Sequence, residues 1–157
     1  MAEDPFSAEE VKSAFLLNFG RFVEWPVQVL QKFPDRFYIC IVGQDPFGDK
    51  LDAIIRTQKI KERIPEVLRL GWTSSVDNCQ IAYVGHVSDK QIQEILSRVK
   101  GKPVLTVGET SNFLKSGGMI QFQPSGERIH LSINLKSAKG SGLIISSKLL
   151  SIAEVIE

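Results

Sequence analysis

The stretch Phe37-Tyr38-Ile39-Cys40-Ile41-Val42-Gly43 decides the fold class. A continuous apolar run that ends at a glycine is typical of a strand covered on both faces of a sheet. Directly after it, we expect Asp45 to cap a helix whose first residue is Pro46, because the missing N–H of proline costs nothing at that position. The sequence therefore predicts a strand, a tight turn and a helix, the repeating unit of an α/β protein.

Working outward, helices and strands continue to alternate. A capping box at Ser7-Ala8-Glu9-Glu10 predicts a helix that runs to about Glu24 and stops before Pro26. Further along, the patterns predict strands at 67–70, 81–85 and 104–107, and a helix from Ser88 to Val99. The expected fold is a single compact α/β domain with a mixed sheet of about five or six strands flanked by helices.

The last third of the chain has a different pattern. Residues 119–123 and 128–133 alternate apolar and polar side chains around the turn-forming residues 124–127, which predicts a late antiparallel hairpin. After the hairpin, Asn134 is expected to cap a short helix through Ala138. Ser146 or Ser147 is expected to cap a final helix that carries Leu149, Leu150, Ala153 and Ile156.

Length and composition limit what the chain does. With 157 residues, 43% of them hydrophobic, we expect one domain over 1–157, with residues 1–6 a disordered or added N-terminal segment. The net charge of +1 and the scattered basic residues exclude nucleic acid as an expected partner. No apolar run approaches the roughly 20 residues of a membrane span, so a soluble chain is expected. The start Met1-Ala2-Glu3-Asp4-Pro5 would suit a protein trimmed after a signal peptide.

Motifs for catalysis, cofactors or metals are not found. The segment 43–50 stands where a phosphate loop would, but Asp49 occupies the position that needs a lysine. Neither Ser125 nor Ser141 lies in a Gly-x-Ser-x-Gly frame. His86 and His130 lack the spacing of a metal site, and the strand pattern predicts that His130 faces outward. We therefore expect no enzyme activity, no cofactor and no metal.

The two cysteines leave two interpretations open. If the strands that carry Cys40 and Cys79 are neighbours, a Cα separation near 5.5 Å is within reach and a disulfide can form. Closing a loop of about 40 residues would stabilise the fold by roughly 4 kcal/mol, and it would imply export to an oxidising compartment. Two buried thiols in a reducing compartment fit the spacing equally well.

Several stretches, taken together, resemble the YfiR family of bacterial periplasmic proteins. They are residues 11–19 (VKSAFLLNF), 21–26 (RFVEWP), 41–48 (IVGQDPFG), 104–108 (VLTVG), 117–120 (GGMI), 133–135 (INL) and 142–150 (GLIISSKLL). They follow the family's order over nearly the whole chain. The signature positions with an expected architectural role are Pro26, Gly108, Gly117, Gly118 and Asn134. Among them, Asn134 is expected to be a helix cap, and Gly117 and Gly118 to be turns with positive φ.

The resemblance implies an exported, non-catalytic regulator. Such a protein inhibits a membrane-bound diguanylate cyclase by contacting its periplasmic part, which lowers cyclic-di-GMP and biofilm formation. An outer-membrane lipoprotein of the peptidoglycan-binding type relieves the inhibition by sequestering the regulator. Cys40 and Cys79 match one of the family's disulfides, which favours the bond. The family's second cysteine pair is absent, so the resemblance does not extend to redox control by that second bond.

Candidate binding residues lie on the first helix. Asn18, Arg21 and Trp25 share one stripe, at spacings of three and seven. They form either a structural network or a contact patch, since Trp and Arg are enriched in binding hot spots.

A second group stands at the start of the last predicted helix. Ser146, Ser147 and Lys148 either cap that helix or hold an anionic group at its N-terminus. An alternative to the inhibitor function follows: an extracytoplasmic small-ligand sensor domain with a pocket lined by Arg21, Trp25 and Lys148. A chain of this size is also compatible with a homodimer.

Overall fold

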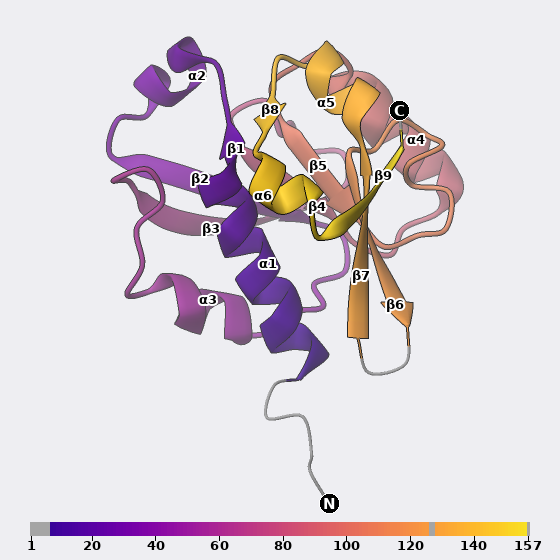
Figure 1. The fold of residues 1–157 in the computed structure, drawn as a ribbon, viewed down its shortest axis with the longest axis horizontal. Coiled ribbons are helices and arrows are strands. Elements are labelled where there is room, and N and C mark those ends of the chain that lie inside the picture. The colour runs from indigo at the N-terminus through magenta and orange to yellow at the C-terminus, as the bar shows by residue number, and fades with distance from the viewer. Residues whose placement is uncertain (1–6, 126–127, 157) are drawn as a thin grey trace, which may run out of the picture.

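The strand expected at residues 37–42 is present and lies within a longer alternation of helices and strands (Figure 1). The computed structural model describes residues 7–125 and 128–156; the expectations for residues 1–6 and for the centre of the hairpin turn therefore lie outside the described residues. The elements are, in order, α1 (Ala8–Phe22), β1 (Val23–Glu24), α2 (Val27–Lys32), β2 (Arg36–Val42), α3 (Lys50–Ile55), β3 (Ile64–Leu70), β4 (Ile81–Val84), α4 (Asp89–Val99), β5 (Leu105–Gly108), β6 (Ile120–Ser125), β7 (Arg128–Asn134), α5 (Leu135–Gly140), β8 (Ile144–Ile145), α6 (Ser147–Leu150) and β9 (Ala153–Ile156).

Seven of the strands form one mixed sheet, in the order β3-β2-β4-β5-β6-β7-β9. The neighbours from β3 to β6 run parallel, β6 and β7 form the antiparallel hairpin, and β9 runs parallel to β7. A separate two-stranded sheet pairs β1 with β8. The expected α/β fold, with a mixed sheet and a late hairpin, is confirmed. The sheet has seven strands because the C-terminal segment adds β9.

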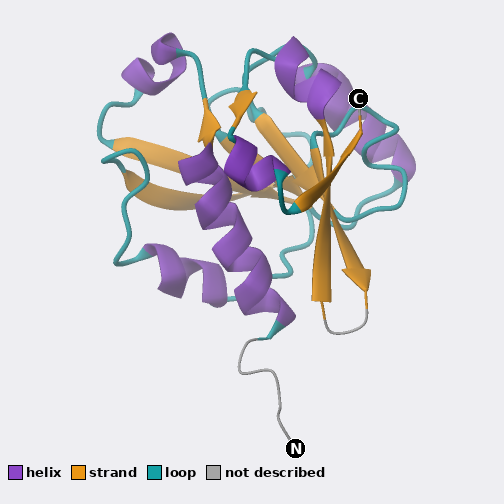
Figure 2. Ribbon diagram, in the orientation of Figure 1, coloured by secondary structure: helices purple, strands orange, loops and turns teal. Residues whose placement is uncertain are grey.

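Different helices cover the two faces of the sheet (Figure 2). On one face, α1 and α3 pack against each other, and Leu16 and Phe19 of α1 share an apolar core with Ile39 of β2. On the other face, α4 packs Ile92 and Leu96 into a second core. Because the side chains of β2 alternate between these two cores, the strand has to be apolar along its whole length.

Three helix starts follow the sequence closely. The hydroxyl of Ser7 accepts the backbone N–H of Glu10 at 3.2 Å, which begins α1. Ser88 and Gln91 form a capping box at α4, and the Asn134 side chain accepts the backbone N–H of Ser137 at 3.1 Å, as expected for a cap of α5. Each cap supplies a partner for an N–H group that the first turn of a helix leaves unpaired.

The helix expected from Pro46 begins later than predicted. The Asp45 carboxylate accepts the N–H of Phe47 at 2.7 Å, and Gly48 has a φ of 58°. This Asx-type turn and the left-handed glycine keep residues 46–49 out of a helix, so α3 begins at Lys50.

The final helix is much shorter than predicted. The structure ends α6 at Leu150, and Ala153–Ile156 pair with β7 as strand β9. Val155 and Ile156 are β-branched and favour a strand, and pairing with β7 satisfies backbone groups along its edge. The prediction that Ala153 and Ile156 continue a helix is therefore wrong.

The signature glycines enclose one phenylalanine. A Cβ on Gly108 would lie 2.6 Å from the ring of Phe113, and a Cβ on Gly118 would lie 2.3 Å from it. Phe113 is fully buried between these two backbones. Gly117 has the expected positive φ, at 105°, but Gly118 does not. The prediction of positive φ is wrong for Gly118, which is needed for the close approach instead.

Candidate functional site

The usual ligand position of this kind of sheet is filled by the chain itself. In open α/β sheets, ligands bind at the carboxyl ends of the strands where the connections diverge. Here that point lies between β2 and β4, since the chain passes from β2 outward to β3 and from β4 in the other direction to β5. A Cβ on Gly85 would lie only 1.9 Å from the carbonyl oxygen of Gln44. The loops after β2 and β4 therefore meet backbone to backbone, and no crevice is left between them.

The charged groups near these strand ends pair with one another. Arg69 lies 2.7 Å from Asp45 and 2.6 Å from Asp52, and these hydrogen bonds raise the pKa of the guanidinium. On the opposite side of β2, the Lys12 Nζ lies 2.6 Å from the Glu109 carboxylate. Among the described residues, no group of three or more His, Cys, Asp or Glu side chains is arranged to hold a metal ion.

Glu109 also holds a buried phenol. The hydroxyl of Tyr83, on β4, donates a hydrogen bond to the Glu109 carboxylate. Burial, followed by this hydrogen bond, raises the pKa of the Tyr83 phenol above its ordinary value. Tyr83 therefore stays protonated under ordinary conditions, and the Lys12–Glu109–Tyr83 group ties α1 to the sheet.

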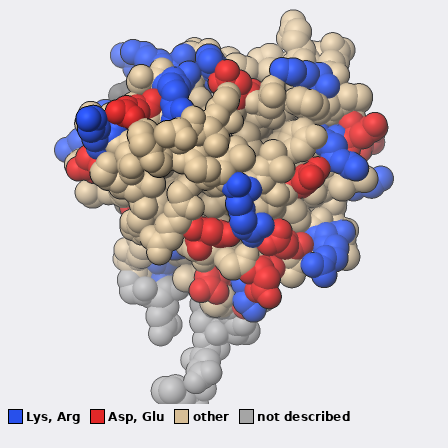
Figure 3. Space-filling view, turned by 180° about the vertical axis from the view of Figure 1, so that it is seen from behind, with Lys and Arg blue, Asp and Glu red and all other residues tan. Residues whose placement is uncertain are grey.

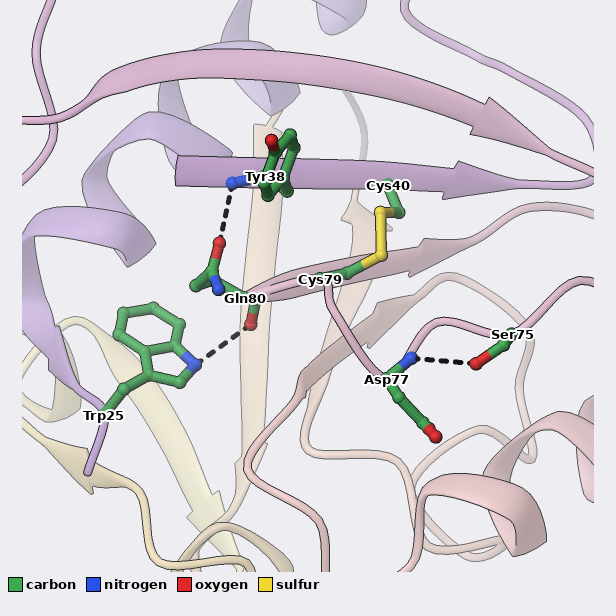
Figure 4. Close-up of a disulfide and its surroundings, with 7 residues drawn as sticks. All are labelled: Trp25, Tyr38, Cys40, Ser75, Asp77, Cys79 and Gln80. Atoms are coloured by element: carbon green, nitrogen blue, oxygen red, sulfur yellow. Dashed lines mark hydrogen bonds between the residues drawn. A yellow bond between two sulfur atoms is a disulfide. The ribbon is translucent and has the colours of Figure 1, made fainter. Parts of the chain in front are cut away.

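Trp25 belongs to a buried network beside the disulfide (Figure 4). Cys40 and Cys79 are bonded, with their Cα atoms 6.0 Å apart, so the expected disulfide is present. The adjacent Gln80 is buried; its side-chain oxygen accepts the N–H of Tyr38 at 2.7 Å, and its carbonyl oxygen accepts the indole N–H of Trp25 at 3.0 Å. Trp25 thus faces the interior, in agreement with the structural alternative. The sequence analysis did not identify Gln80. The only sequence signal for it was its position directly after Cys79.

The other two candidates on α1 point to different surroundings. Asn18 lines a mainly apolar groove of about 350 Å³ between α1 and α3, together with Phe15 and Ile54. Arg21 is exposed, and its guanidinium donates to the side-chain oxygen of Gln58 at 2.6 Å. The stripe predicted on α1 therefore does not form one shared site: one residue lies in a groove, one on the surface and one in the core.

The second candidate group lies beside the end of α1. β1 pairs with β8, and the N–H of Ser146 donates to the carbonyl oxygen of Phe22 at 2.8 Å. Ser146 caps α6 by accepting the N–H of Lys148 at 3.2 Å. Ser147 and Lys148 are exposed. α6 has only four residues, so few peptide dipoles are aligned and its N-terminus attracts an anion only weakly.

Exposed apolar side chains gather next to this group. The large hydrophobic residues with the greatest exposure are Val27, Ile64, Ile144, Ile152, Val155 and Ile156. All except Val27 and Ile64 lie on β8, on β9 or on the link from α6 to β9, which are the C-terminal, yellow elements of Figure 1. We call the surface formed by Ile144, Ser147, Lys148, Ile152, Val155 and Ile156 the β8–β9 surface.

The β8–β9 surface includes an open sheet edge. Within the described part of the chain, β9 pairs with β7 on one side only, and it ends the strand order. Its outer N–H and C=O groups are free to pair with another chain. Several exposed apolar residues at and beside such an edge mark a site of protein contact more often than a catalytic centre. The sequence reasoning missed this surface because it assigned Ile156 to the buried side of a helix.

These features define a small α/β domain that is cross-linked by one disulfide. The crevice between the loops after β2 and β4 is closed, and exposed apolar residues lie at one edge of the sheet. The model of the YfiR/HmsC-like family matches residues 9–154, so the chain belongs to this family. The family is a regulatory one and supports a general role in periplasmic diguanylate cyclase signalling. No helix of the described residues is long and apolar enough to span a bilayer.

Proposed function

We propose that this protein is a non-catalytic periplasmic regulator that inhibits a membrane-bound diguanylate cyclase by binding the cyclase's periplasmic part. The inhibition lowers cyclic-di-GMP and with it biofilm formation. Family membership supports the signalling context. The disulfide between Cys40 and Cys79 supports an oxidising compartment, because such bonds are rare in the reducing cytosol.

The observation that carries the proposal is the exposure of the β8–β9 surface. Ile144 is 64% exposed and Ile152 is 62% exposed, although both side chains are large and apolar. Covering such side chains with a partner stabilises a complex by about 1.5 to 3 kcal/mol for each one fully buried. Ser147 and Lys148 supply the polar rim that is typical of protein interfaces.

Catalysis has no support at the usual position. The direct contact between Gly85 and Gln44 leaves no room for a substrate between the loops after β2 and β4. The titratable groups nearest to it, among them Asp45 and Glu109, are engaged by Arg69 and Lys12. Regulation by contact needs neither a pocket nor a free acid or base there.

The β8–β9 surface is also the proposed point of control. An outer-membrane peptidoglycan-binding lipoprotein that covers the same residues would release the cyclase, because two partners cannot occupy one surface at once. A homodimer through β9 would block the surface in the same way. We propose that the exposed Arg21, which precedes the Phe22 whose carbonyl oxygen accepts the N–H of Ser146, contributes to the contact from its edge.

The test compares charge insertion in the β8–β9 surface with charge insertion at the opposite edge of the main sheet. The double variant Ile144→Glu, Ile152→Glu places carboxylates within the β8–β9 surface. The control Ile64→Glu changes another exposed isoleucine, 52% exposed, on the opposite edge strand β3. Each oxidised protein is added to membranes that carry the cyclase, and both cyclase capture and cyclic-di-GMP synthesis are measured.

The expected result is that the wild type and the Ile64→Glu control capture and inhibit the cyclase, whereas the double variant does neither. Equal melting temperatures of the three proteins would exclude misfolding as the reason. Inhibition by the double variant at the wild-type concentration would refute contact through this surface. If even the wild type neither binds nor inhibits, the inhibitor function itself is refuted.

A further inference from the structure

A second concave site lies on the other side of α5 from the contact surface. A groove of about 690 Å³ opens between α4, the segment 114–119 and α5. Three lysines line it: Lys100 directly after α4, Lys115 in the segment 114–119 and Lys136 in α5. The sequence spacing gave no hint of this group, because the three residues are brought together only by the fold.

The groove is strongly positive for a protein of net charge +1. None of the residues that line it is acidic, and none of the three lysines forms an ion pair with any described residue. Elsewhere on the molecule basic and acidic side chains lie among one another, as the view from behind in Figure 3 shows. Uncompensated like charges in a concavity attract an anion and raise its local concentration.

The floor of the groove is apolar. Leu96 and Val99 of α4, together with Leu114 and Met119, are buried and line it from below the lysines. The volume lies within the range of about 300 to 1,000 Å³ that is typical of small-molecule sites. A ligand that fits both features has an apolar body and at least one negatively charged group.

The wall of the groove is held in place by hydrogen bonds of two signature residues, Asn134 and Gly118. The Asn134 side chain donates to the carbonyl oxygen of Leu114 at 3.4 Å while it caps α5. The N–H of Gly118 donates to the carbonyl oxygen of Phe113 at 2.9 Å. The segment that carries Lys115 is therefore fixed against α5 before a ligand arrives, which reduces the entropy lost on binding.

We infer that this groove binds a small organic anion, namely a molecule with an apolar body and a carboxylate or phosphate group. The lysines contact the charged group, and Leu96, Val99 and Met119 contact the apolar body. The site is separate from the β8–β9 surface, and its existence does not depend on the proposed inhibition of a cyclase.

The test uses a matched pair of probes that differ only in charge. The oxidised, isotope-labelled protein is titrated with 4-phenylbutanoate and with its neutral amide, and backbone amide shifts are followed by NMR. Inorganic phosphate serves as a probe of charge without an apolar body. The expected result is a saturable shift of amides in 96–101, 114–119 and 136–141 with the carboxylate, and a weaker response to the amide and to phosphate.

Two lysine variants give the matched comparison. Lys115→Gln with Lys136→Gln removes two charges from the groove, whereas Lys50→Gln with Lys59→Gln removes two exposed charges elsewhere. The groove variant is expected to bind 4-phenylbutanoate roughly tenfold more weakly, since exposed charge pairs contribute up to about 1 kcal/mol each. The control variant is expected to bind as the wild type does. Unchanged spectra outside the groove establish that each variant is folded.

Three outcomes would overturn the inference. The first is equal binding of the acid and its neutral amide, which would make the lysines irrelevant. The second is a response confined to the apolar groove between α1 and α3, around Phe15 and Ile54. The third is no binding of any small anion while a glutamate-rich peptide binds, which would assign the groove to a protein partner.

Discussion

Replacing both cysteines by alanine is expected to lower the free energy of unfolding by about 4 kcal/mol. The bond joins Cys40 and Cys79 over a sequence separation of 39 residues. Cross-linking a loop of this length removes about 13 cal/mol/K from the entropy of the unfolded chain, or about 4 kcal/mol at 25 °C. Both cysteines are buried, so the bond has little contact with solvent in the folded protein.

The effect is measured by guanidinium and thermal unfolding of the wild type and the Cys40→Ala, Cys79→Ala variant. For a chain of this size, 4 kcal/mol corresponds to a drop of roughly 8 to 16 °C in Tm. The wild type unfolded in the presence of a reductant is the control, because it keeps both sulfur atoms and separates loop entropy from the void left by alanine. A loss below about 1 kcal/mol in both samples would refute the entropic argument.

Three further changes test the interior. Gly85→Ala is expected to lower the free energy of unfolding by about 1 to 3 kcal/mol, because the added Cβ meets a backbone oxygen. Gly71→Ala, where a Cβ has nothing within 4 Å, should leave the free energy of unfolding nearly unchanged. Equal effects of the two substitutions would contradict the closed crevice. Gln80→Met should cost about 1 to 3 kcal/mol by leaving the N–H of Tyr38 unpaired, and a neutral effect would show that this bond is dispensable. Because folding raises the pKa of Tyr83, the unfolded chain loses this proton first as pH rises above about 10, so stability falls there by up to about 1.4 kcal/mol per pH unit. Tyr83→Phe should lose stability less steeply in urea titrations between about pH 9 and 11, and parallel curves would contradict the raised pKa.

The order and type of the main elements follow from local sequence signals. β2 is apolar because both of its faces are covered, and that pattern is visible in Phe37–Val42 without any tertiary information. The caps at Ser7, Ser88 and Asn134 depend only on residues three positions apart. These elements are decided within one helical turn or one strand, and there the sequence was sufficient, except at α3, whose start the Asp45 turn and Gly48 delay.

The C-terminal segment could not be predicted in this way. Leu149, Leu150, Ala153 and Ile156 have the spacing of a helix, but the segment Ala153–Ile156 lies next to the unpaired edge of β7. Pairing across that edge outweighs a weak local preference, as tertiary contacts often do. The two-residue strands β1 and β8 were missed for the same reason, since each is defined only by its distant partner.

The candidate residues of the first helix differ in how deeply they are buried. Spacing along a helix shows which residues share a side, but not how far each one lies from the surface. Asn18, Arg21 and Trp25 share a side of α1 in sequence, yet the chain bends into β1 after Phe22, and this turns Trp25 toward Gln80 in the interior. Conversely, the lysines of the groove are far apart in sequence, and no motif connects them. Surface sites assembled from separate elements depend on the fold as a whole.

The placement of α5 connects the two surfaces on which function is proposed. α5 packs against β8 and β9, which carry the contact surface, and its Lys136, Ser137 and Gly140 line the groove proposed to bind an anion. It is a helix of six residues held at its start by the Asn134 cap and followed by Gly142, with φ of 78°. The two proposed surfaces therefore share this one short helix. If a bound anion displaces α5, the packing at β9 changes with it, and a partner on β9 would then change the affinity of the groove by the same factor, because linkage is reciprocal.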